Sequence, residues 1–254
     1  MPPFAATAIR STGKAIRKLD PDGRELRRME QRFQAAVARA LSALRSALTR
    51  GLTEENVQGL AGRLDDPAIA RPFQDAIVRE MQRVAVAGSE FGREQVETFV
   101  FGVKAAAVEV GAWELANNAA AEWATGYAYD LVTGLLATTR QALQAEVAEY
   151  VRNSETIGQL VTRIRQASGF ADTRAQMIAV TEVTRAFARG NLEAWKAGGV
   201  IEKRRWNTNN DELVCPVCGP LNGQVVGLDE EFDGGIAAPP AHPRCRCWAT
   251  PVVE

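Results

Sequence analysis

The residues best suited to chemistry are four cysteines and one histidine, all between positions 215 and 247. The chain has no other cysteine or histidine. A Cys-x-x-Cys turn presents two thiolates to one ion, and a second group of cysteine or histidine completes a tetrahedron. The sequence Cys215-Pro-Val-Cys218 is followed, after 23 residues rich in turn-forming types, by His242-Pro-Arg-Cys245-Arg-Cys247. This pattern predicts a structural zinc site made by four of five residues: Cys215, Cys218, His242, Cys245 and Cys247.

Five candidate ligands exceed the four positions of a tetrahedral site, and the sequence leaves open which one stays outside. If residues 244–248 are extended, Cys245 and Cys247 point to the same face, which favours an all-thiolate site with His242 nearby. If the His242-Pro243 segment is a turn, His242 and either Cys245 or Cys247 complete a site of three cysteines and one histidine. The prolines at 239, 240 and 243 stiffen this loop and favour the second arrangement.

Other chemistries fit the sequence less well. Disulfides need an oxidising compartment, and residues 1–16 have no apolar core long enough for a signal peptide. A catalytic zinc needs an open position and a nearby base, for which Glu230, Glu231 and Asp233 are the candidates. However, the sequence has no His-Glu-x-x-His motif and no deaminase pattern. We therefore expect a closed structural site and no enzyme activity.

The charge is unevenly distributed, although the net charge is only -1. Residues 1–50 hold 11 Lys and Arg against 4 Asp and Glu, a balance of +7, and the remaining residues balance at -8. Such a basic segment fits a nucleic acid or an acidic protein surface, and a solvated helix face is the alternative. The candidate contacts are Arg24, Arg27, Arg28 and Arg32, together with Arg244 and Arg246 beside the cysteines. No apolar run is long enough for a membrane span, so no membrane partner is expected.

Hydrophobic periodicity predicts a helical body. Apolar residues at spacings of three and four predict a helix over residues 22–50, and another is expected over 173–196. Between them we expect shorter helices, with a break at Arg71-Pro72, an end at Gly88 before a capping Ser89, and interruptions at glycines 102, 111 and 126. Further helices are expected over 138–152 and from Ser154 onward. On the last long helix, Glu182 and Arg185 are expected to form an ion pair or a polar seam against the zinc module.

The character of the chain changes at Val200. Short alternating runs at 200–208, 225–226 and 247–249 predict strands separated by Gly, Pro and Asp. So small a module has little apolar mass, and a metal would be needed to hold it together. The predicted fold is mainly α. A multi-helix N-terminal and central body is followed by a small, zinc-stapled, β-containing C-terminal module, so the fold is α+β overall. The predicted divisions are a flexible basic arm (1–20), a helical N-terminal region (21–137) and a C-terminal domain (138–254) with the zinc module at about 200–254.

Several strings in the C-terminal part resemble a known family. They are Thr181-Glu182-Val-Thr184-Arg185-Ala186 with Asn191, then Gly199-Val200, Trp206, Asp211-Glu212-Leu-Val-Cys215-Pro-Val-Cys218, Leu221-Asn-Gly223 and Pro239-Pro240-Ala-His242-Pro243-Arg-Cys245-Arg246-Cys247. Together they resemble the C-terminal domain of phage minor head proteins, the head-morphogenesis proteins similar to the F protein of phage Mu. The resemblance covers roughly residues 140–250, and its last block is the most specific part.

The resemblance implies a structural protein of the virion, present in few copies at the portal vertex or capsid interior and in the host cytoplasm during assembly. It implies a role in head assembly or in DNA packaging and delivery. Its expected partners are the portal protein, the major capsid protein or both, with packaged DNA as a further candidate. Two alternatives stay open: a zinc-ribbon-like nucleic-acid-binding protein that uses Arg244, Arg246 and the basic arm, and a metal-dependent enzyme that uses Glu182.

Overall fold

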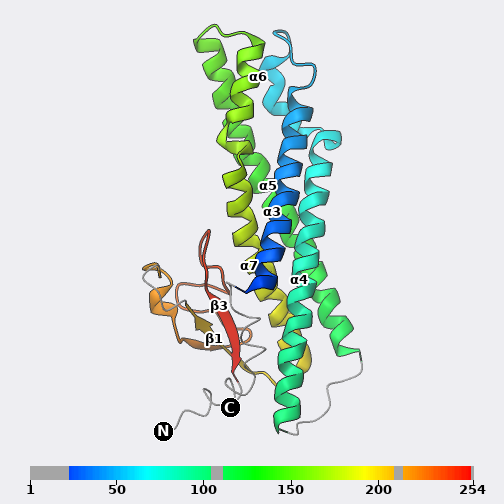
Figure 1. Ribbon diagram of the computed structural model, residues 1–254, viewed down its shortest axis with the longest axis vertical. Helices are drawn as coiled ribbons and strands as arrows, with labels where there is room; N and C mark the ends of the chain where they lie inside the picture. The colour runs from blue at the N-terminus through cyan, green and yellow to red at the C-terminus, as the bar shows by residue number, and fades with distance from the viewer. Residues whose placement is uncertain (1–22, 104–110, 209–213, 253–254) are drawn as a thin grey trace. The chain divides into compact units, whose positions relative to one another are not determined.

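The computed structural model describes residues 23–103, 111–208 and 214–252. These residues are mainly helical, with a small sheet near the C-terminal end, which confirms the predicted fold class (Figure 1). The predicted basic arm (1–20) and a predicted turn at 209–211 lie outside the described residues. None of the helices in the described ranges combines the length and the apolar character needed to cross a lipid bilayer.

The chain forms two compact units that are interleaved along the sequence. One unit takes in the start of α3 up to Glu30, the stretch Met81–Ala124 and the chain from Val180 onward. The other takes in Gln31–Glu80 and Thr125–Ala179. We call the first the site unit, because it contains the whole cysteine and histidine cluster, and the second the helical unit. The predicted domain boundaries at 20 and 137 stay predictions.

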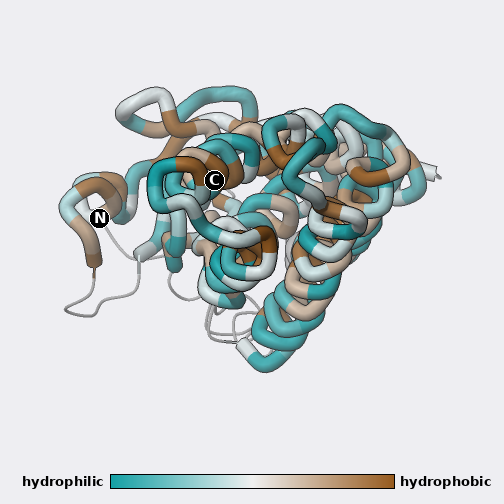
Figure 2. The backbone as a smooth tube through the Cα atoms, turned by 90° about the horizontal axis from the view of Figure 1, so that it is seen from above, coloured by the Kyte–Doolittle hydropathy of each residue, from teal (hydrophilic) through white to brown (hydrophobic). Residues whose placement is uncertain are grey.

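The helical unit is built on buried helix faces. Its elements are α3 (Arg24–Thr49), the 3-10 helix η1 (Val57–Asp65), α4 (Pro67–Val103), α5 (Ala112–Arg152), α6 (Ile157–Gln166), η2 (Ser168–Phe170) and α7 (Asp172–Gly198), of which α3, α4, α5 and α7 also contribute to the site unit. In α3, the predicted apolar stripe is buried at Phe33, Val37, Leu41, Leu44 and Leu48. Figure 2 shows the same alternation along the helical tubes, where hydrophobic and hydrophilic residues follow one another within each turn. One face of α3 therefore builds core while the other meets solvent.

Two predicted interruptions of α4 are wrong. The helix runs unbroken from Pro67 to Val103 with Pro72 inside it, and Ser89 lies in its interior instead of capping a new helix. The buried side chains of Phe73 and Ile77 directly after Pro72 explain the continuity, since packing of an apolar face outweighs the one hydrogen bond that a proline removes.

The predicted interruption of α5 at Gly126 and the separate start near Thr138 are also wrong. Residues Ala112–Arg152 form one helix, in which small residues are buried at every fourth position: Ala112, Ala116, Ala120, Ala124 and Ala128. This repeat keeps one helix face in contact with its neighbours, so the cost of a glycine, about 1 kcal/mol, does not break the helix. The predicted interruption at Gly111 fits the structure, because its φ of +90° directly precedes α5.

The start of α6 lies slightly later than the sequence suggests. Thr156, rather than Ser154, is the N-cap, and it forms a capping box with Gln159. The hydroxyl of Thr156 accepts from the backbone of Gln159, whose side chain accepts from the backbone N–H of Thr156 at 2.7 Å. This reciprocal pair satisfies two N–H groups that the first helical turn leaves without partners.

In the site unit, α4 and α7 approach each other through glycines. A Cβ atom added at Gly190 would lie 1.9 Å from the carbonyl oxygen of Ala85, and one added at Gly88 would lie 2.3 Å from that of Phe187. Only glycine fits at such backbone contacts. Phe91 and Phe187 also pack together across the two helices, with ring centroids 5.6 Å apart. The C-terminal half of α7, which leads into the sheet, is thereby fixed on α4.

The small sheet holds three antiparallel strands in the order β2-β1-β3, with β1 (Lys203–Asn207), β2 (Val225–Gly227) and β3 (Trp248–Val252). All three lie where the alternating runs of the sequence predict strands. A short 3-10 helix, η3 (Gly219–Leu221), stands between β1 and β2. Alternate residues of β1, Arg204 and Trp206, are buried, and the Trp206 ring packs edge-on against Phe232 with centroids 5.1 Å apart.

Two hydrophobic clusters secure this module. The first joins Trp206, Cys218, Leu221, Phe232, Cys245 and Cys247, so three of the four cysteines belong to the module core. The second joins Val96 of α4 and Leu192 and Trp195 of α7 to Ile201 and Ala249. The sheet is thus packed on the helices of the site unit by one cluster, while the other surrounds the cysteines.

Candidate metal centre

Two loops bring the candidate ligands together. Cys215 and Cys218 lie in the turn that leads into η3, and His242, Cys245 and Cys247 lie in the loop before β3. The first turn is closed by the Cys218 backbone N–H, which donates to the Cys215 carbonyl oxygen at 3.1 Å. Gly219 donates to the same carbonyl at 3.0 Å, so the chain continues directly into the 3-10 helix.

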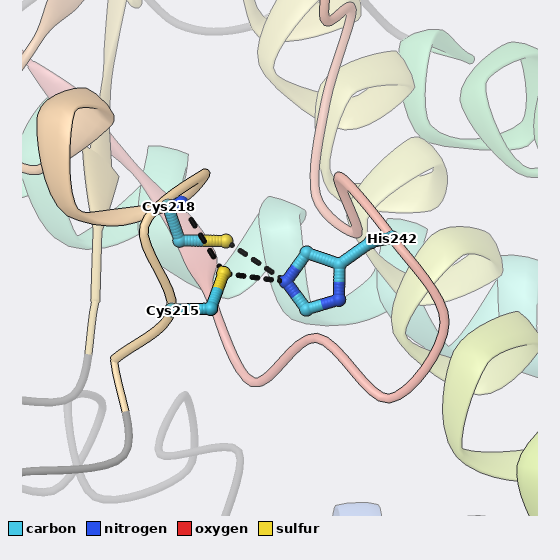
Figure 3. Close-up of side chains that lie close together, drawn as sticks. All are labelled: Cys215, Cys218 and His242. Atoms are coloured by element: carbon cyan, nitrogen blue, oxygen red, sulfur yellow. Dashed lines mark hydrogen bonds between the residues drawn. The ribbon is translucent and has the colours of Figure 1, made fainter.

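Figure 3 shows three side chains that point toward one centre, those of Cys215, Cys218 and His242. The His242 Nε2 atom lies 3.0 Å from the Cys215 sulfur and 3.2 Å from the Cys218 sulfur. The Cys218 sulfur also lies 3.7 Å from that of Cys245. For a zinc–sulfur bond of about 2.3 Å, a tetrahedron separates two sulfurs by about 3.8 Å, so this last spacing matches an ion between them.

The five donors form two overlapping groups. Cys215, Cys218 and His242 make one, and Cys218, Cys245 and Cys247 make the other, with all donor atoms of a group within 4.8 Å of one another. The cluster could therefore hold a metal ion, with Cys218 common to both groups. The predicted set of four ligands stays a prediction.

The histidine is held in the tautomer that a metal ligand needs. Its Nδ1 atom lies 2.8 Å from the carbonyl oxygen of Pro243, which can only accept, so Nδ1 carries the proton. In the neutral ring the lone pair is then on Nε2, the atom that faces the sulfurs of Cys215 and Cys218. Such a contact from the second nitrogen is the usual way in which proteins orient a ligating histidine.

The four thiols differ in the direction in which their surroundings shift the pKa. The hydrogen bond from Cys247, with backbone donors, lowers the pKa of Cys245 to about 5 despite its burial. That hydrogen bond and burial raise the pKa of Cys247, and burial raises the pKa of Cys218 to about 12. Within the cluster, the pKa of Cys245 is therefore lowered while those of Cys218 and Cys247 are raised. A divalent cation would favour further thiolates, because it compensates the negative charge that burial disfavours.

The donor set fits a soft or borderline metal held for structure. Three cysteines of the cluster are buried, and thiolate with imidazole is the donor combination of structural zinc sites. Of the predicted candidate bases, Glu230 accepts a hydrogen bond from the Gly227 backbone N–H at 2.8 Å, and so it closes the turn after β2. Asp233 is held through its backbone N–H, which donates to Gln224 at 3.1 Å.

The loop before β3 contains the predicted turn. Arg244 has a φ of +59°, and the Cys245 backbone N–H donates to the His242 carbonyl oxygen at 3.1 Å. Arg244 is therefore not part of an extended segment, and β3 starts at Trp248. A turn at His242-Pro243 is what the structure shows.

The predicted arginine contacts lie at separate places. Arg244 and Arg246 line a pocket of about 40 Å³ beside the cluster, together with Cys215, Cys218 and His242. On α3, the side chains of Arg24, Arg27 and Arg28 are exposed. Arg32 belongs to the helical unit, where its Nε atom pairs with Glu80 at 3.5 Å.

The polar residues of α7 include a contact that the sequence does not reveal. The Thr181 hydroxyl accepts a hydrogen bond from the Arg244 backbone N–H at 3.1 Å, which ties the ligand loop to α7. Its only signal is that Thr181 lies in one of the strings that carry the family resemblance. The expected ion pair is present: Glu182 is buried, and its carboxylate lies 3.2 Å from the Arg185 Nε atom.

The fold and the cluster define a helical protein whose C-terminal module is of the kind that a structural metal ion stabilises. Comparison with known families then places the segment that contains the module. Residues 141–250 match the model of the family described as phage Mu protein F like protein. The match confirms the resemblance found in the sequence. It begins inside α5, includes α6, α7 and all five candidate ligands, and ends within β3.

A curated relative is also similar to part of the chain. The uncharacterized protein YqbB of Bacillus subtilis (strain 168) is 22% identical over an alignment of 156 residues that covers 56% of this chain. The chain spans about half the length of this relative, 51%. No solved structure gives a significant match.

Proposed function

We propose that the protein is a structural, non-enzymatic minor head protein of a tailed phage or a related particle. In this role it associates with the portal or the capsid interior and aids head assembly or DNA packaging and delivery. The observation that carries the proposal is the family match over residues 141–250, which supports a phage head-related structural role. The burial of three of the four cysteines supports a structural rather than a catalytic use of the module.

Zinc is the proposed cofactor of the module, and its role is to stabilise the fold. The core around Trp206 and Phe232 contains few large apolar side chains and includes three cysteines. A module with so small a core gains little from burial alone, and metal binding adds its free energy directly to folding.

The test is deletion of the gene from the phage or prophage that encodes the chain, followed by purification of the particles. We expect the polypeptide to co-purify with wild-type heads and to be protected from protease until the heads are opened. Particles without it should show lower infectivity, with defects in DNA content or delivery. Fully assembled, DNA-filled and fully infectious particles that lack the polypeptide would contradict the proposal.

Complementation with substituted chains tests whether the cysteine cluster is needed for the function of the protein in the particle. Cys218→Ser removes the donor that both groups share and should fail to restore infectivity. Gly134→Ala is a matched control, because a Cβ atom at this α5 position meets nothing within 4 Å, and it should restore infectivity fully. Tagged wild-type chain should retain the portal or capsid protein in a pull-down from producing cells.

Nucleic-acid binding is a second candidate, supported by the position of Arg244 and Arg246 at the pocket beside the cluster. If these side chains contact phosphates, the affinity for duplex DNA should fall steeply with salt, and Arg244→Ala should reduce the slope by about 1 on logarithmic axes. Arg185→Ala, which removes a side chain paired with Glu182, is the control for general loss of charge. Binding that is absent, or insensitive to salt, would contradict this candidate.

A further inference from the structure

One peptide unit of the loop before β3 is hydrogen-bonded on both of its sides. Its carbonyl oxygen, that of Pro243, lies 2.8 Å from the Nδ1 atom of the His242 ring. Its N–H group, that of Arg244, donates to the Thr181 hydroxyl at 3.1 Å. A peptide unit is planar, so the direction of its N–H group fixes the direction of its carbonyl oxygen. The contact with Thr181 therefore determines where the acceptor for the His242 ring lies.

The opposite nitrogen of the same ring faces the candidate metal site. The His242 Nε2 atom lies 3.0 Å from the Cys215 sulfur and 3.2 Å from the Cys218 sulfur (Figure 3). These three residues form one of the two groups that could hold a metal ion. Because Nδ1 donates to a carbonyl oxygen, Nε2 has the lone pair that a metal ion needs. A chain of hydrogen bonds thus leads from Thr181, through one peptide unit and one ring, to the atom that would bind the ion.

Thr181 belongs to a helix that is firmly held. Its side chain is 6% exposed on α7. Further along α7, the buried Trp195 donates from its Nε1 atom to the side-chain oxygen of Gln95 on α4 at 2.9 Å. Together with the glycine contacts between the same two helices, this bond fixes α7 on α4. A site that is supported by a packed helix is held more precisely than one supported by a loop alone.

The backbone at Arg244 needs such support. Its φ of +59° lies in the left-handed region, which is unfavourable for a residue with a Cβ atom. Two hydrogen bonds hold this conformation, the one from its own N–H group to Thr181 and the one from the Cys245 N–H group to the His242 carbonyl oxygen at 3.1 Å. A strained conformation of this kind persists only where its surroundings determine it. Without the Thr181 contact, the peptide unit would be free to rotate and to carry the acceptor of His242 with it.

From this connection we propose that Thr181 is a positioning residue for the metal site. Through the Pro243–Arg244 peptide unit, it holds the His242 ring with Nε2 directed at the ion. This role depends on the proposed zinc cofactor, with His242 as one of its ligands, and it is the same for every choice of the remaining ligands. It gives α7 a part in metal binding, although no cysteine or histidine lies on this helix.

The zinc affinity of the full-length protein, measured by competition with a chelating indicator, tests the proposal. Thr181→Val has a similar shape but lacks the acceptor, and it should lower the affinity about 10- to 100-fold, as is typical when the support of a ligating histidine is lost. Thr181→Ser keeps the hydroxyl and should retain most of the affinity. Thr181→Ala should behave as the valine variant does, and it keeps the test decisive if valine disturbs the packing of α7.

Thr184→Val is the matched control on the same helix. Thr184 is also buried, and its hydroxyl donates to the Val180 carbonyl oxygen within α7 at 3.0 Å. This variant should therefore keep the wild-type zinc affinity. In the metal-free protein, Thr181→Val and Thr184→Val should unfold at the same temperature by helical circular dichroism, because the proposed role of Thr181 concerns the metal site and not the stability of the helix.

The signals of the His242 ring separate positioning from a general loss of stability. His242 is the only histidine of the chain, so selective isotope labelling of histidine gives a single imidazole in the NMR spectrum. In the zinc-loaded wild-type protein, the Nδ1–H proton should exchange slowly with solvent, because a carbonyl oxygen accepts it. The exchange should be faster in zinc-loaded Thr181→Val and unchanged in Thr181→Ser and Thr184→Val.

Wild-type affinity and slow exchange in Thr181→Val would overturn the proposal, because the ring would then be held without the hydroxyl. Equal losses of affinity in Thr181→Val and Thr184→Val, or in Thr181→Val and Thr181→Ser, would also overturn it. A wild-type protein that binds no zinc would overturn this role and the proposed cofactor together, and co-purification would still decide the association with heads. Zinc binding as described, in a protein that is dispensable for infectivity, would overturn only the head role.

Discussion

Arg204 is a charged side chain inside the core of the C-terminal module. It is 3% exposed, its guanidinium lies 5.1 Å from the centroid of the Phe232 ring, and its Nη2 atom donates to the Glu230 carbonyl oxygen at 2.6 Å. Burial lowers the pKa of this guanidinium, with the positive charge of Arg189 as a second cause. The side chain therefore stacks on one wall of the module and ties down the loop after β2 at the same time.

Arg204→Lys should lower the free energy of unfolding of the module by about 1–3 kcal/mol, because an ammonium cannot keep the planar stack and the directed hydrogen bond together. The neighbouring change Lys203→Arg, at a half-buried position on the other face of β1, should alter it by less than about 0.5 kcal/mol. Urea unfolding followed by tryptophan fluorescence measures both. Equal effects of the two substitutions would show that Arg204 acts only through its charge.

Asp229, in the same loop, makes a pH-dependent contribution to the stability of the fold. The Lys196 ammonium of α7 hydrogen-bonds to its carboxylate and holds the pKa of Asp229 below its usual value. A carboxyl with a depressed folded-state pKa stabilises the fold above its unfolded pKa, and the contribution is lost as pH falls through the depressed value.

Asp229→Asn should therefore reduce stability at neutral pH, whereas wild type and variant should converge at acid pH, once the pH has fallen below the depressed pKa of Asp229. The effect should be small and should shrink in about 1 M salt, since the carboxylate is on the surface. Thermal unfolding of both proteins across this pH range measures the difference. A difference that persists at the acid end would mean that the asparagine disturbs the loop for another reason.

At the scale of the elements, the packing of α4 on α7 depends on glycine. A Cβ atom at Gly190 would lie 1.9 Å from the Ala85 carbonyl oxygen and 2.6 Å from the Ser89 backbone nitrogen. These are backbone atoms, so no side-chain rotation relieves the contact. Ser89, itself 1% exposed, fits there because it is small.

Gly190→Ala should destabilise the protein by about 1–3 kcal/mol through overpacking of this helix contact. Gly134→Ala on α5 should have the opposite sign and stabilise by up to about 1 kcal/mol, because its Cβ meets nothing and alanine favours helix. Equilibrium denaturation of the two variants and the wild-type protein measures the direction of both stability changes. Stabilisation by alanine at both sites would contradict the close approach of the two helices.

These contacts show where sequence reasoning succeeds and where it fails. The long amphipathic helix α3 and the strands β1 and β3 follow from local periodicity, and so they were predictable. Gly88 and Ser89 predict a helix end from the sequence, because glycine often terminates a helix and serine often caps the next one. In the structure Gly88 lies against Phe187, 99 residues later, and Ser89 lies against Gly190, 101 residues later, and a single sequence does not show such pairings.

The candidate ligands could be predicted from the sequence, but the conformation of their loop and its hydrogen bond to α7 could not. Spacing alone identifies Cys215 and Cys218 as a pair, and His242, Cys245 and Cys247 as the second group of candidates. The sequence does not show that Arg244 takes a positive φ, or that Thr181 accepts from its backbone. Both features depend on how the loop packs on α7, and this is decided by tertiary contacts.

At the scale of the whole molecule, the two compact units are built from segments that alternate along the chain. A division of the sequence into consecutive blocks cannot reproduce such an arrangement. The cysteine and histidine cluster belongs entirely to the site unit, in which the sheet module forms only one part of the core. Loss of a metal ion should therefore affect the module first and the helices last.

Treatment with a chelator tests this order. Removal of the ion should open the region 203–252, because the core around Trp206 is too small to persist alone, while the extensive helical packing elsewhere keeps its structure. We expect a red shift in tryptophan emission and protease cleavage between β1 and β3, with little loss of helical circular dichroism. Trp206→Phe should remove most of the fluorescence change, which assigns that change to the module.

Cys218→Ser is the matched control for the chelator, since it lacks the donor common to both groups and should already resemble the chelated protein. Addition of zinc should restore the wild-type protein and leave this variant unchanged. A chelated wild-type protein whose module stays resistant to protease would show that hydrophobic packing alone holds residues 203–252. Collapse of the helical signal on chelation would show instead that the helices of the site unit depend on the module, through the cluster of Val96, Trp195 and Ile201.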